Sequence, residues 1–176
     1  MSDPYEPFSA VNLFSRGCSQ TRSAGVDSVE LSRHPFVRPF SARQTDALAR
    51  IAEECSFEPG QIIFEEKEES DKFYLLLEGR VAVGCRAAGR EINVQTLGPG
   101  EELGWSCVLP DASRHFRARA VVRVRAFVFE STRLGEFCDS DLAFGFLFLR
   151  SMVEVITERL QATQSRLVQM SRRSAP

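Results

Sequence analysis

The chain has 176 residues, enough for one domain that buries about two thirds of the surface of its unfolded form. Its 43% of hydrophobic and 26% of charged residues are ordinary for a globular protein, and no apolar run reaches the length of a membrane span. A formal net charge of −2 provides no overall attraction to nucleic acid. Composition therefore favours a soluble domain of the cytoplasm and argues against a membrane or DNA partner.

Cysteine and histidine usage argues against a metal site. The five cysteines are far apart and form no Cys-x-x-Cys pair, so no zinc knuckle or iron–sulfur cluster is indicated and reduced thiols are expected. A metalloenzyme needs a cluster of histidine and carboxylate ligands, but His34 and His115 are the only histidines. Motifs for a nucleophilic serine or a phosphate-binding lysine loop are missing. We expect a binding protein without a metal, not an enzyme.

The N-terminal part predicts a loose leader followed by helices. Residues 1–26 are rich in Ser, Gly, Pro and Arg and show neither helical nor strand periodicity. A short helix follows, after which Phe36 and Phe40 would close the base of the domain. Ser41 is placed to cap a second helix that runs to about Cys55, with apolar residues at helical spacing.

The middle of the chain predicts antiparallel strands. From Phe57 to Glu101, short β-branched and aromatic runs are divided by turn residues at Pro59-Gly60, Gly79 and Gly98. The run FYLLL is apolar on both faces of a strand, so it must be covered on both sides. Residues 27–140 are therefore predicted to be mainly β with flanking helices, folded as an antiparallel double-stranded β-helix, or jelly roll.

Among these strands lies a glycine-rich stretch, from Gly98 to Val122, that indicates an anion site. Glycine permits positive φ and close approach of a ligand, and a tight turn from Gly104 to Leu109 would direct backbone N–H groups at one point. A following arginine would add a forked cation. The candidate ligand-binding residues of this stretch are Gly104, Trp105, Ser106, Cys107, Arg114 and His115.

Several of these residues have a second interpretation. Arg114 could be a solvated charge on an exposed strand, and Trp105, the only tryptophan, could fill a gap in the core instead of lining a pocket. The arginines that alternate from position 117 to position 125 are expected to form one polar face, with a surface for an anionic partner as the alternative.

The C-terminal part predicts one long helix, residues 141–171, and a short tail at 172–176. Asp141 can cap this helix, and no proline interrupts it. Its residues at alternating spacings of four and three form a heptad seam: Leu149, Val153, Ile156, Leu160, Thr163, Leu167 and Met170. The seam could pack on the β-roll or pair with a second copy. Because such a helix extends about 43 Å, beyond a small roll, we expect a parallel homodimer.

These motifs resemble the cyclic-nucleotide-binding domain of the catabolite-activator family. The stretch from Pro59 through Val81 is similar to that family's strand pattern, and the glycine-rich loop is similar to its phosphate-binding cassette, F-G-E-x-[AG]-L followed by R-[ST]-A. In this register Arg114 stands for the phosphate arginine. Trp105 replaces the glutamate that holds the ribose 2′-hydroxyl, and His115 replaces the serine or threonine that supports the phosphate.

The resemblance implies a regulatory module that senses a cyclic nucleotide, such as cAMP or cGMP, and acts through a dimer or a protein partner. The segment RLQATQ, from Arg159 to Gln164, resembles the family's RLQVTS, which makes Thr163 the candidate contact to the base. Regulators of the family continue into a helix-turn-helix, whereas this chain ends at Pro176, so direct DNA binding is not expected. The alternative is a degenerate fold that binds no nucleotide and serves as a protein-interaction adaptor.

Overall fold

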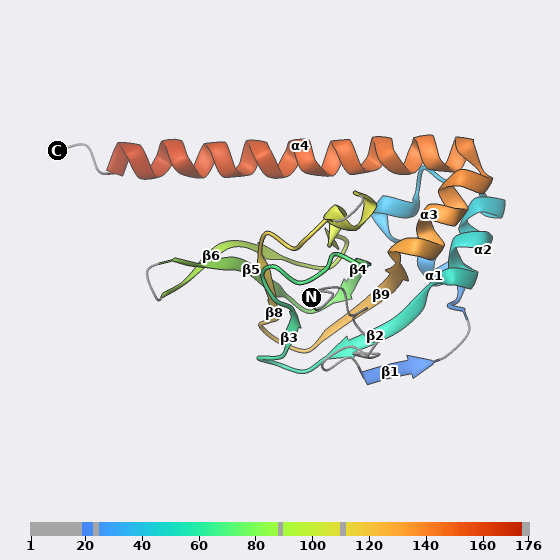
Figure 1. Cartoon of the computed structure of the whole chain (residues 1–176), viewed down its shortest axis with the longest axis horizontal. Helices are drawn as coiled ribbons and strands as arrows, with labels where there is room; N and C mark the ends of the chain where they lie inside the picture. Colours follow the sequence, from blue (N-terminus) through green and yellow to red (C-terminus); the bar gives the residue numbers. More distant parts are fainter. Residues whose placement is uncertain (1–18, 23–24, 88–89, 110–111, 174–176) are drawn as a thin grey trace, which may run out of the picture.

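The strands form two antiparallel sheets around a common core (Figure 1). The computed structural model describes residues 19–22, 25–87, 90–109 and 112–173, with side chains for most of residues 25–165 and for Val168. One sheet has the strand order β1-β2-β9-β4-β7 and the other the order β3-β8-β5-β6. The strands are β1 (Ser19–Arg22), β2 (Glu53–Phe57), β3 (Ile62–Phe64), β4 (Lys72–Glu78), β5 (Val81–Ala87), β6 (Arg90–Leu97), β7 (Glu102–Leu103), β8 (Arg117–Ala120) and β9 (Val124–Glu130). The predicted jelly-roll class is confirmed.

The helices pack against the five-stranded sheet. They are α1 (Ser28–Ser32), η1 (Pro35–Val37), α2 (Ala42–Ile51), η2 (Trp105–Val108), α3 (Ser131–Ser140) and α4 (Leu142–Arg173), where η marks a 3-10 helix. Asp141 caps α4 as predicted, because its Oδ1 accepts a hydrogen bond from the backbone N–H of Phe144 at 2.9 Å. This bond holds the pKa of the Asp141 carboxyl below its usual value.

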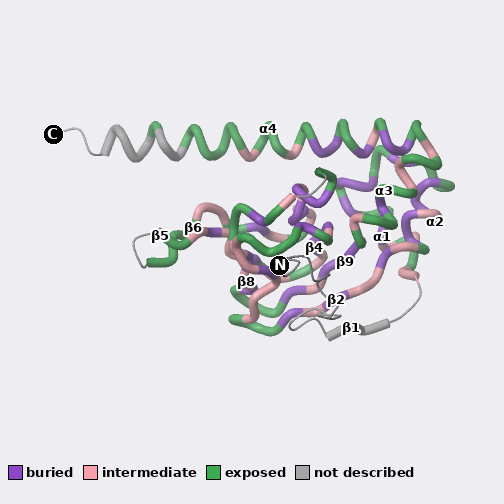
Figure 2. Tube along the Cα trace, viewed as in Figure 1, coloured by how far each residue is buried: buried purple, intermediate pink, exposed green. Residues whose placement is uncertain are grey.

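Strands β4 and β9 are buried on both faces, as the FYLLL run predicts for β4. Tyr74 points into the core between the sheets, whereas Phe73 belongs to a second core beneath the helices. In that second core the ring of Phe148 lies 5.4 Å from that of Phe36 and 5.7 Å from that of Phe73, both edge to face. Phe36 and Phe40 are buried there, as predicted. Figure 2 shows buried residues along both strands and at the start of α4, while most of the described residues in the rest of α4 are exposed.

Two segments differ from the predictions. The helix α2 ends at Ile51, and Glu53–Phe57 is strand β2, not helix, because pairing with β9 buries Cys55 and Phe57 between the sheets. Ser19–Arg22, within the predicted loose leader, forms β1 and pairs with β2. The predictions for residues 1–18 and for the end of the tail at 174–176 lie outside the described residues.

The prediction of reduced thiols is wrong for Cys55, which is disulfide-bonded, whereas Cys85, Cys107 and Cys138 are free. Disulfides are rare in the reducing cytosol, so cysteine usage does not support a cytoplasmic location. Within the described residues, no group of three or more His, Cys, Asp or Glu side chains could hold a metal ion. Among the described helices, none combines the length and the apolar character of a membrane span.

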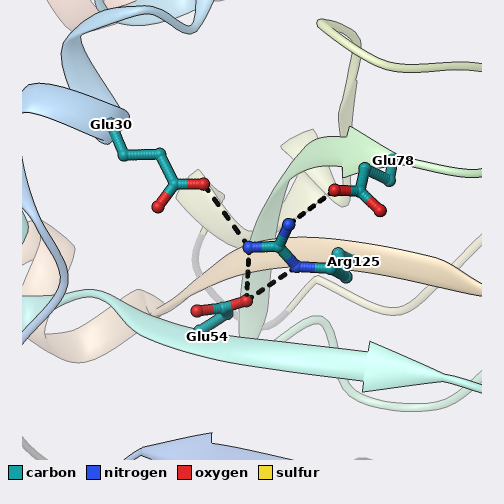
Figure 3. A network of polar contacts seen from close by, with 4 residues as sticks. All are labelled: Glu30, Glu54, Glu78 and Arg125. Atoms are coloured by element: carbon teal, nitrogen blue, oxygen red, sulfur yellow. Dashed lines mark hydrogen bonds and ion pairs between the residues drawn. The ribbon is translucent and has the colours of Figure 1, made fainter.

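Arg125 of β9 joins three other elements (Figure 3). Its guanidinium nitrogens lie 2.7 Å from Glu54 of β2, 2.5 Å from Glu78 of β4 and 3.4 Å from Glu30 of α1. Hydrogen bonds to Glu54 and Glu78 raise the pKa of Arg125. The remaining arginines of this run also have carboxylate partners, namely Arg117, Arg119 and Arg123. The prediction that these arginines share one face is wrong, because Arg117 and Arg119 lie on β8 of the four-stranded sheet and Arg125 lies on β9 of the five-stranded sheet. Their ion pairs match these positive charges within the protein.

Replacing Arg125 with Gln is expected to lower the free energy of unfolding by about 1.5–3 kcal/mol, because hydrogen bonds to charged groups are lost and three carboxylates remain together. Arg123→Gln is the matched control. Its ion pair with Glu58 is largely exposed on both sides, so its loss should cost less than about 1 kcal/mol. Urea unfolding of both variants measures the difference. Equal losses would show that the Arg125 cluster contributes no more than a surface ion pair.

His34 gives the fold a pH dependence, because burial lowers its pKa to about 4. An unfolded histidine titrates near 6.5, so between pH 6.5 and 4 the unfolded state binds a proton that the folded state does not. The free energy of unfolding should therefore fall by up to about 3 kcal/mol as the pH drops through this window. His34→Gln should flatten this part of a urea-unfolding profile. A profile of the variant as steep as that of the wild-type protein would contradict the assignment.

Candidate ligand-binding site

A cavity of about 320 Å³ lies where β3, β5, β6 and β7 meet η2 and α4. Its volume is at the lower end of the range for small-molecule sites. Its lining is mainly apolar with a few polar groups: Phe64, Val83, Val94, Gln95, Leu103, Gly104, Trp105, Ser106, Arg114, His115, Phe116, Ile156, Arg159, Leu160 and Thr163. The glycine-rich loop that predicts an anion site thus borders a cavity of suitable size.

Gly104 allows the loop to pass close to Arg114. Its φ of 86° lies in the left-handed region, and a Cβ atom here would lie 2.5 Å from the Lys72 carbonyl oxygen and 2.6 Å from Arg114 Nη1. Both the backbone conformation and the lack of space therefore require glycine. The helix η2 begins directly after Gly104 and forms the predicted tight turn.

Arg114 is a buried cation, not a solvated charge, with 3% of its surface exposed. Its Nη2 donates a hydrogen bond to the Lys72 carbonyl oxygen at 2.8 Å, and its guanidinium carbon lies 4.3 Å from the centre of the Phe64 ring. The carboxylate of Asp71 is exposed and 3.7 Å away. Nε and Nη1 are buried and have no hydrogen-bond partner among the described residues. Burial lowers the pKa of Arg114, yet an arginine stays charged at neutral pH. The guanidinium is therefore suited to bind an anion.

The neighbouring loop residues have different surroundings. The Ser106 hydroxyl is buried and lies 2.7 Å from the Ser70 hydroxyl, so it already has a partner. His115 is exposed at the cavity. Trp105 lines the cavity and also packs against the core beneath the helices, so both interpretations of this side chain apply. Cys107 lies in that core and lines a separate cavity beside α3, and burial raises its pKa to about 12.

The helix α4 forms one wall of the cavity with Ile156, Leu160 and Thr163. Arg159 connects this part of α4 to the β-roll. Its Nη2 donates to the Glu102 carboxylate at 2.7 Å and also to the Glu102 carbonyl oxygen. Burial raises the pKa of the Glu102 carboxyl, and the charge of Arg159 opposes that shift. This buried ion pair positions α4 beside β7 at the edge of the cavity.

Six of the seven predicted ligand-binding residues line this one cavity, and Cys107 does not. The lining residues that sequence analysis left unassigned are Phe64, Val83, Val94, Gln95, Leu103, Phe116 and Arg159. Arg159 begins the RLQATQ segment, so that segment contained a signal for it. The strand residues have only the alternation common to all strands, which does not distinguish a cavity wall from a core. Ile156 and Leu160, predicted for the dimer seam, line the cavity as well.

The outer face of α4 carries an exposed apolar stripe. Its members are 39% to 79% exposed and recur at spacings of four and three: Leu142, Phe146, Leu149, Val153, Ile156 and Leu160. The stripe begins at Leu142, so it includes two residues, Leu142 and Phe146, that precede Leu149, the first residue of the predicted seam. Another face of the helix is buried against the rest of the domain through Phe144, Phe148 and Met152. The side chains of Leu167 and Met170 lie outside the described part of the chain.

Comparison with known proteins matches this architecture to one family. The model of the cyclic nucleotide-binding domain matches residues 54–141, which is half of the chain. The CRP-like cAMP-activated global transcriptional regulator of Mycobacterium tuberculosis is 26% identical over 125 residues, covering 70% of this chain and 54% of that protein. The chain thus spans about half the length of the curated relatives it matches.

Solved structures show the same fold. A Geobacter metallireducens protein assigned to the cyclic nucleotide-binding proteins has a TM-score of 0.68 at 27% identity, covering 77% of this chain and 98% of its own. A cyclic nucleotide-binding domain from Methylobacillus flagellatus has a TM-score of 0.76 at 16% identity, covering 84% and 86% of the two chains. The second similarity, at this low identity, concerns the fold alone.

Gly104→Ala is expected to destabilise the domain more than Gly60→Ala, by about 1–3 kcal/mol. Both glycines have a positive φ, so both variants carry a backbone cost of about 1–2 kcal/mol. A Cβ atom at Gly60 meets nothing within 4 Å, whereas one at Gly104 must displace both the Lys72 carbonyl and the Arg114 side chain. Urea unfolding measures both losses. Equal losses in the free energy of unfolding would mean that the loop at Gly104 accommodates the added methyl group without further cost.

Proposed function

Because the chain belongs to the cyclic nucleotide-binding domain family, we propose that it is a regulatory module that senses a small anionic ligand in the cavity beside α4. One observation carries the proposal: Arg114 is buried at this cavity with two donors that have no described partner. A buried charge is costly unless an opposite charge joins it. A cyclic nucleotide, cAMP or cGMP, is the first candidate, since its phosphate is an anion and the Mycobacterium tuberculosis relative is a cAMP-activated regulator.

The helix α4 is the proposed output of the module. A ligand in the cavity would contact Ile156, Leu160 and Thr163 directly, and Thr163 would be the contact to a base. The ion pair between Arg159 and Glu102 holds the same turns of α4 against β7. A ligand with different affinity for two positions of α4 would shift the population between them. The module would then act through a dimer or a partner protein, without catalysis and without direct contact to DNA.

The apolar stripe on α4 supports a parallel homodimer as part of this proposal. Val153, Ile156 and Leu160 belong both to the predicted interface and to the exposed stripe. Burying such a side chain contributes about 1.5–3 kcal/mol, and a symmetric dimer buries every position twice. Thr163 continues the same spacing as a polar position, which can fix the register of two paired helices.

Trp105 favours a second candidate function, a protein-interaction adaptor that binds no nucleotide. The family pattern has a glutamate at this position, and the indole takes its place at the cavity. Glu102, the carboxylate close by in the sequence, is paired with Arg159 and is not available to a ligand hydroxyl. In this case the exposed stripe of α4 would serve only to form contacts between proteins.

Titration calorimetry with cAMP and cGMP distinguishes the two functions. We expect a nucleotide to bind the wild-type protein and its affinity to fall about 10- to 100-fold in Arg114→Gln, because a hydrogen bond to a charged group contributes about 1.5–3 kcal/mol. Arg119→Gln, on β8 outside the cavity, is the matched control and should bind normally. If saturating nucleotide produces no heat and no rise in melting temperature, the adaptor function is favoured.

Phe146→Glu combined with Val153→Glu should convert the dimer into a folded monomer, because like charges would face each other across the axis. Both side chains are exposed in the single chain, and neither lines the ligand cavity. Gln161→Glu adds a charge at an exposed position of α4 off the stripe and should leave the dimer intact. Sedimentation velocity at tens of micromolar measures the mass. A monomeric wild-type protein would refute the dimer.

A further inference from the structure

We infer that the preferred ligand of this cavity is an anion with an apolar body, that is, a carboxylate or phosphate group attached to a hydrocarbon chain or ring. The inference rests on the proposed function, because it names the chemical class of ligand for the same site. It follows from three properties of the cavity: the composition of its walls, the state of its polar groups and the position of Arg114, whose carboxylate partner is exposed.

The walls of the cavity are mainly apolar. Side chains from five different elements contribute apolar surface: Phe64, Val83, Leu103, Trp105, Ile156 and Leu160. Ile156 and Leu160 are among the exposed large apolar residues, so the wall on α4 is partly in contact with water. An apolar ligand would remove this surface and its own from water, and the gain increases with the area buried. A ligand covered with hydroxyl groups would not obtain this gain.

Three of the polar side chains that line the cavity are already engaged within the protein. The Ser106 hydroxyl is paired with Ser70 at 2.7 Å, and the Thr163 hydroxyl donates to the Arg159 carbonyl oxygen at 2.9 Å. The Arg159 guanidinium binds Glu102. Among the described lining side chains, those that remain to meet polar atoms of a ligand are Gln95, the indole N–H of Trp105, the exposed His115 and the two unpaired nitrogens of Arg114. Each ligand hydroxyl that loses water without finding a partner should weaken binding about tenfold.

Arg114 explains why the ligand must also be an anion. The charge of Arg159, the other arginine of the lining, is matched by the buried carboxylate of Glu102. The partner of Arg114 is the exposed Asp71 at 3.7 Å, which water screens. The Nη2 bond to the Lys72 carbonyl and the contact with the Phe64 ring hold the guanidinium in place. A ligand anion would therefore find a fixed cation next to apolar walls, where the attraction is stronger than in water.

Three probes separate these requirements in calorimetry: octanoate, which has both the anion and the apolar body; 1-octanol, which lacks the charge; and ribose 5-phosphate, which carries hydroxyl groups in place of hydrocarbon. We expect octanoate to bind at least tenfold more tightly than either of the others. Trp105 is the only tryptophan of the chain and lines the cavity, so octanoate should also shift the tryptophan emission. Arg114→Gln should weaken octanoate at least tenfold, and Arg119→Gln should not.

The outcomes distinguish this inference from the proposed function when cAMP and cGMP are titrated alongside. A nucleotide that binds while octanoate does not would overturn the inference and leave the proposed function standing. Octanoate that binds no better than 1-octanol would overturn it too, and this comparison uses only wild-type protein, so it does not depend on the folding of a variant. If octanoate and both nucleotides fail to bind, the inference and the proposed function are both wrong.

Discussion

The strand β4 has no solvent-facing side, and the rest of the structure depends on this. It lies between β9 and β7 in the five-stranded sheet, with Tyr74 in the core between the sheets and Phe73 in the core beneath the helices. A displacement of β4 would therefore disturb both cores at once. The strand thus holds the groups that are bonded to it in fixed positions. Helices η1 and α4 meet it through the rings of Phe36 and Phe148.

The candidate site is built on the first residue of this rigid strand. Lys72 begins β4, and its carbonyl oxygen holds the guanidinium of Arg114 on one side while limiting the space at Gly104 on the other. Phe64 of β3 covers the guanidinium. A cation held in this way does not have to rearrange when an anion arrives, so little binding energy is lost to ordering the site. The burial of β4 on both faces therefore also fixes the position of the Arg114 side chain at the cavity.

In the proposed function, the helix α4 would couple ligand binding to dimerisation. One face carries Phe144 and Phe148 into the core beneath the helices, and Arg159 adds an ion pair to Glu102. The outer face carries the exposed apolar stripe. Ile156 and Leu160 belong to both the stripe and the cavity wall. A second copy and a ligand would therefore contact the same side chains, and each would change the affinity for the other by the same factor.

By itself, the sequence determined the features that depend on neighbouring residues. The apolar run of β4 requires cover on both faces, Asp141 caps α4 through its own first turn, and the spacing of four and three places the stripe on one face of that helix. The glycine at position 104 and the following arginine likewise predict an anion site within a short stretch of chain.

Only the tertiary structure decided the features that join distant residues. Glu53–Phe57 is a strand because β9 pairs with it, and the five residues alone do not contain that information. Arg159 finds its partner Glu102 at a separation of 57 residues, and Cys107 turns away from the cavity because the core beneath α3 accepts it. The walls of the cavity come from strands and helices between Phe64 and Thr163. Which of their side chains meet is set by the packing of whole elements, and local periodicity does not encode that packing.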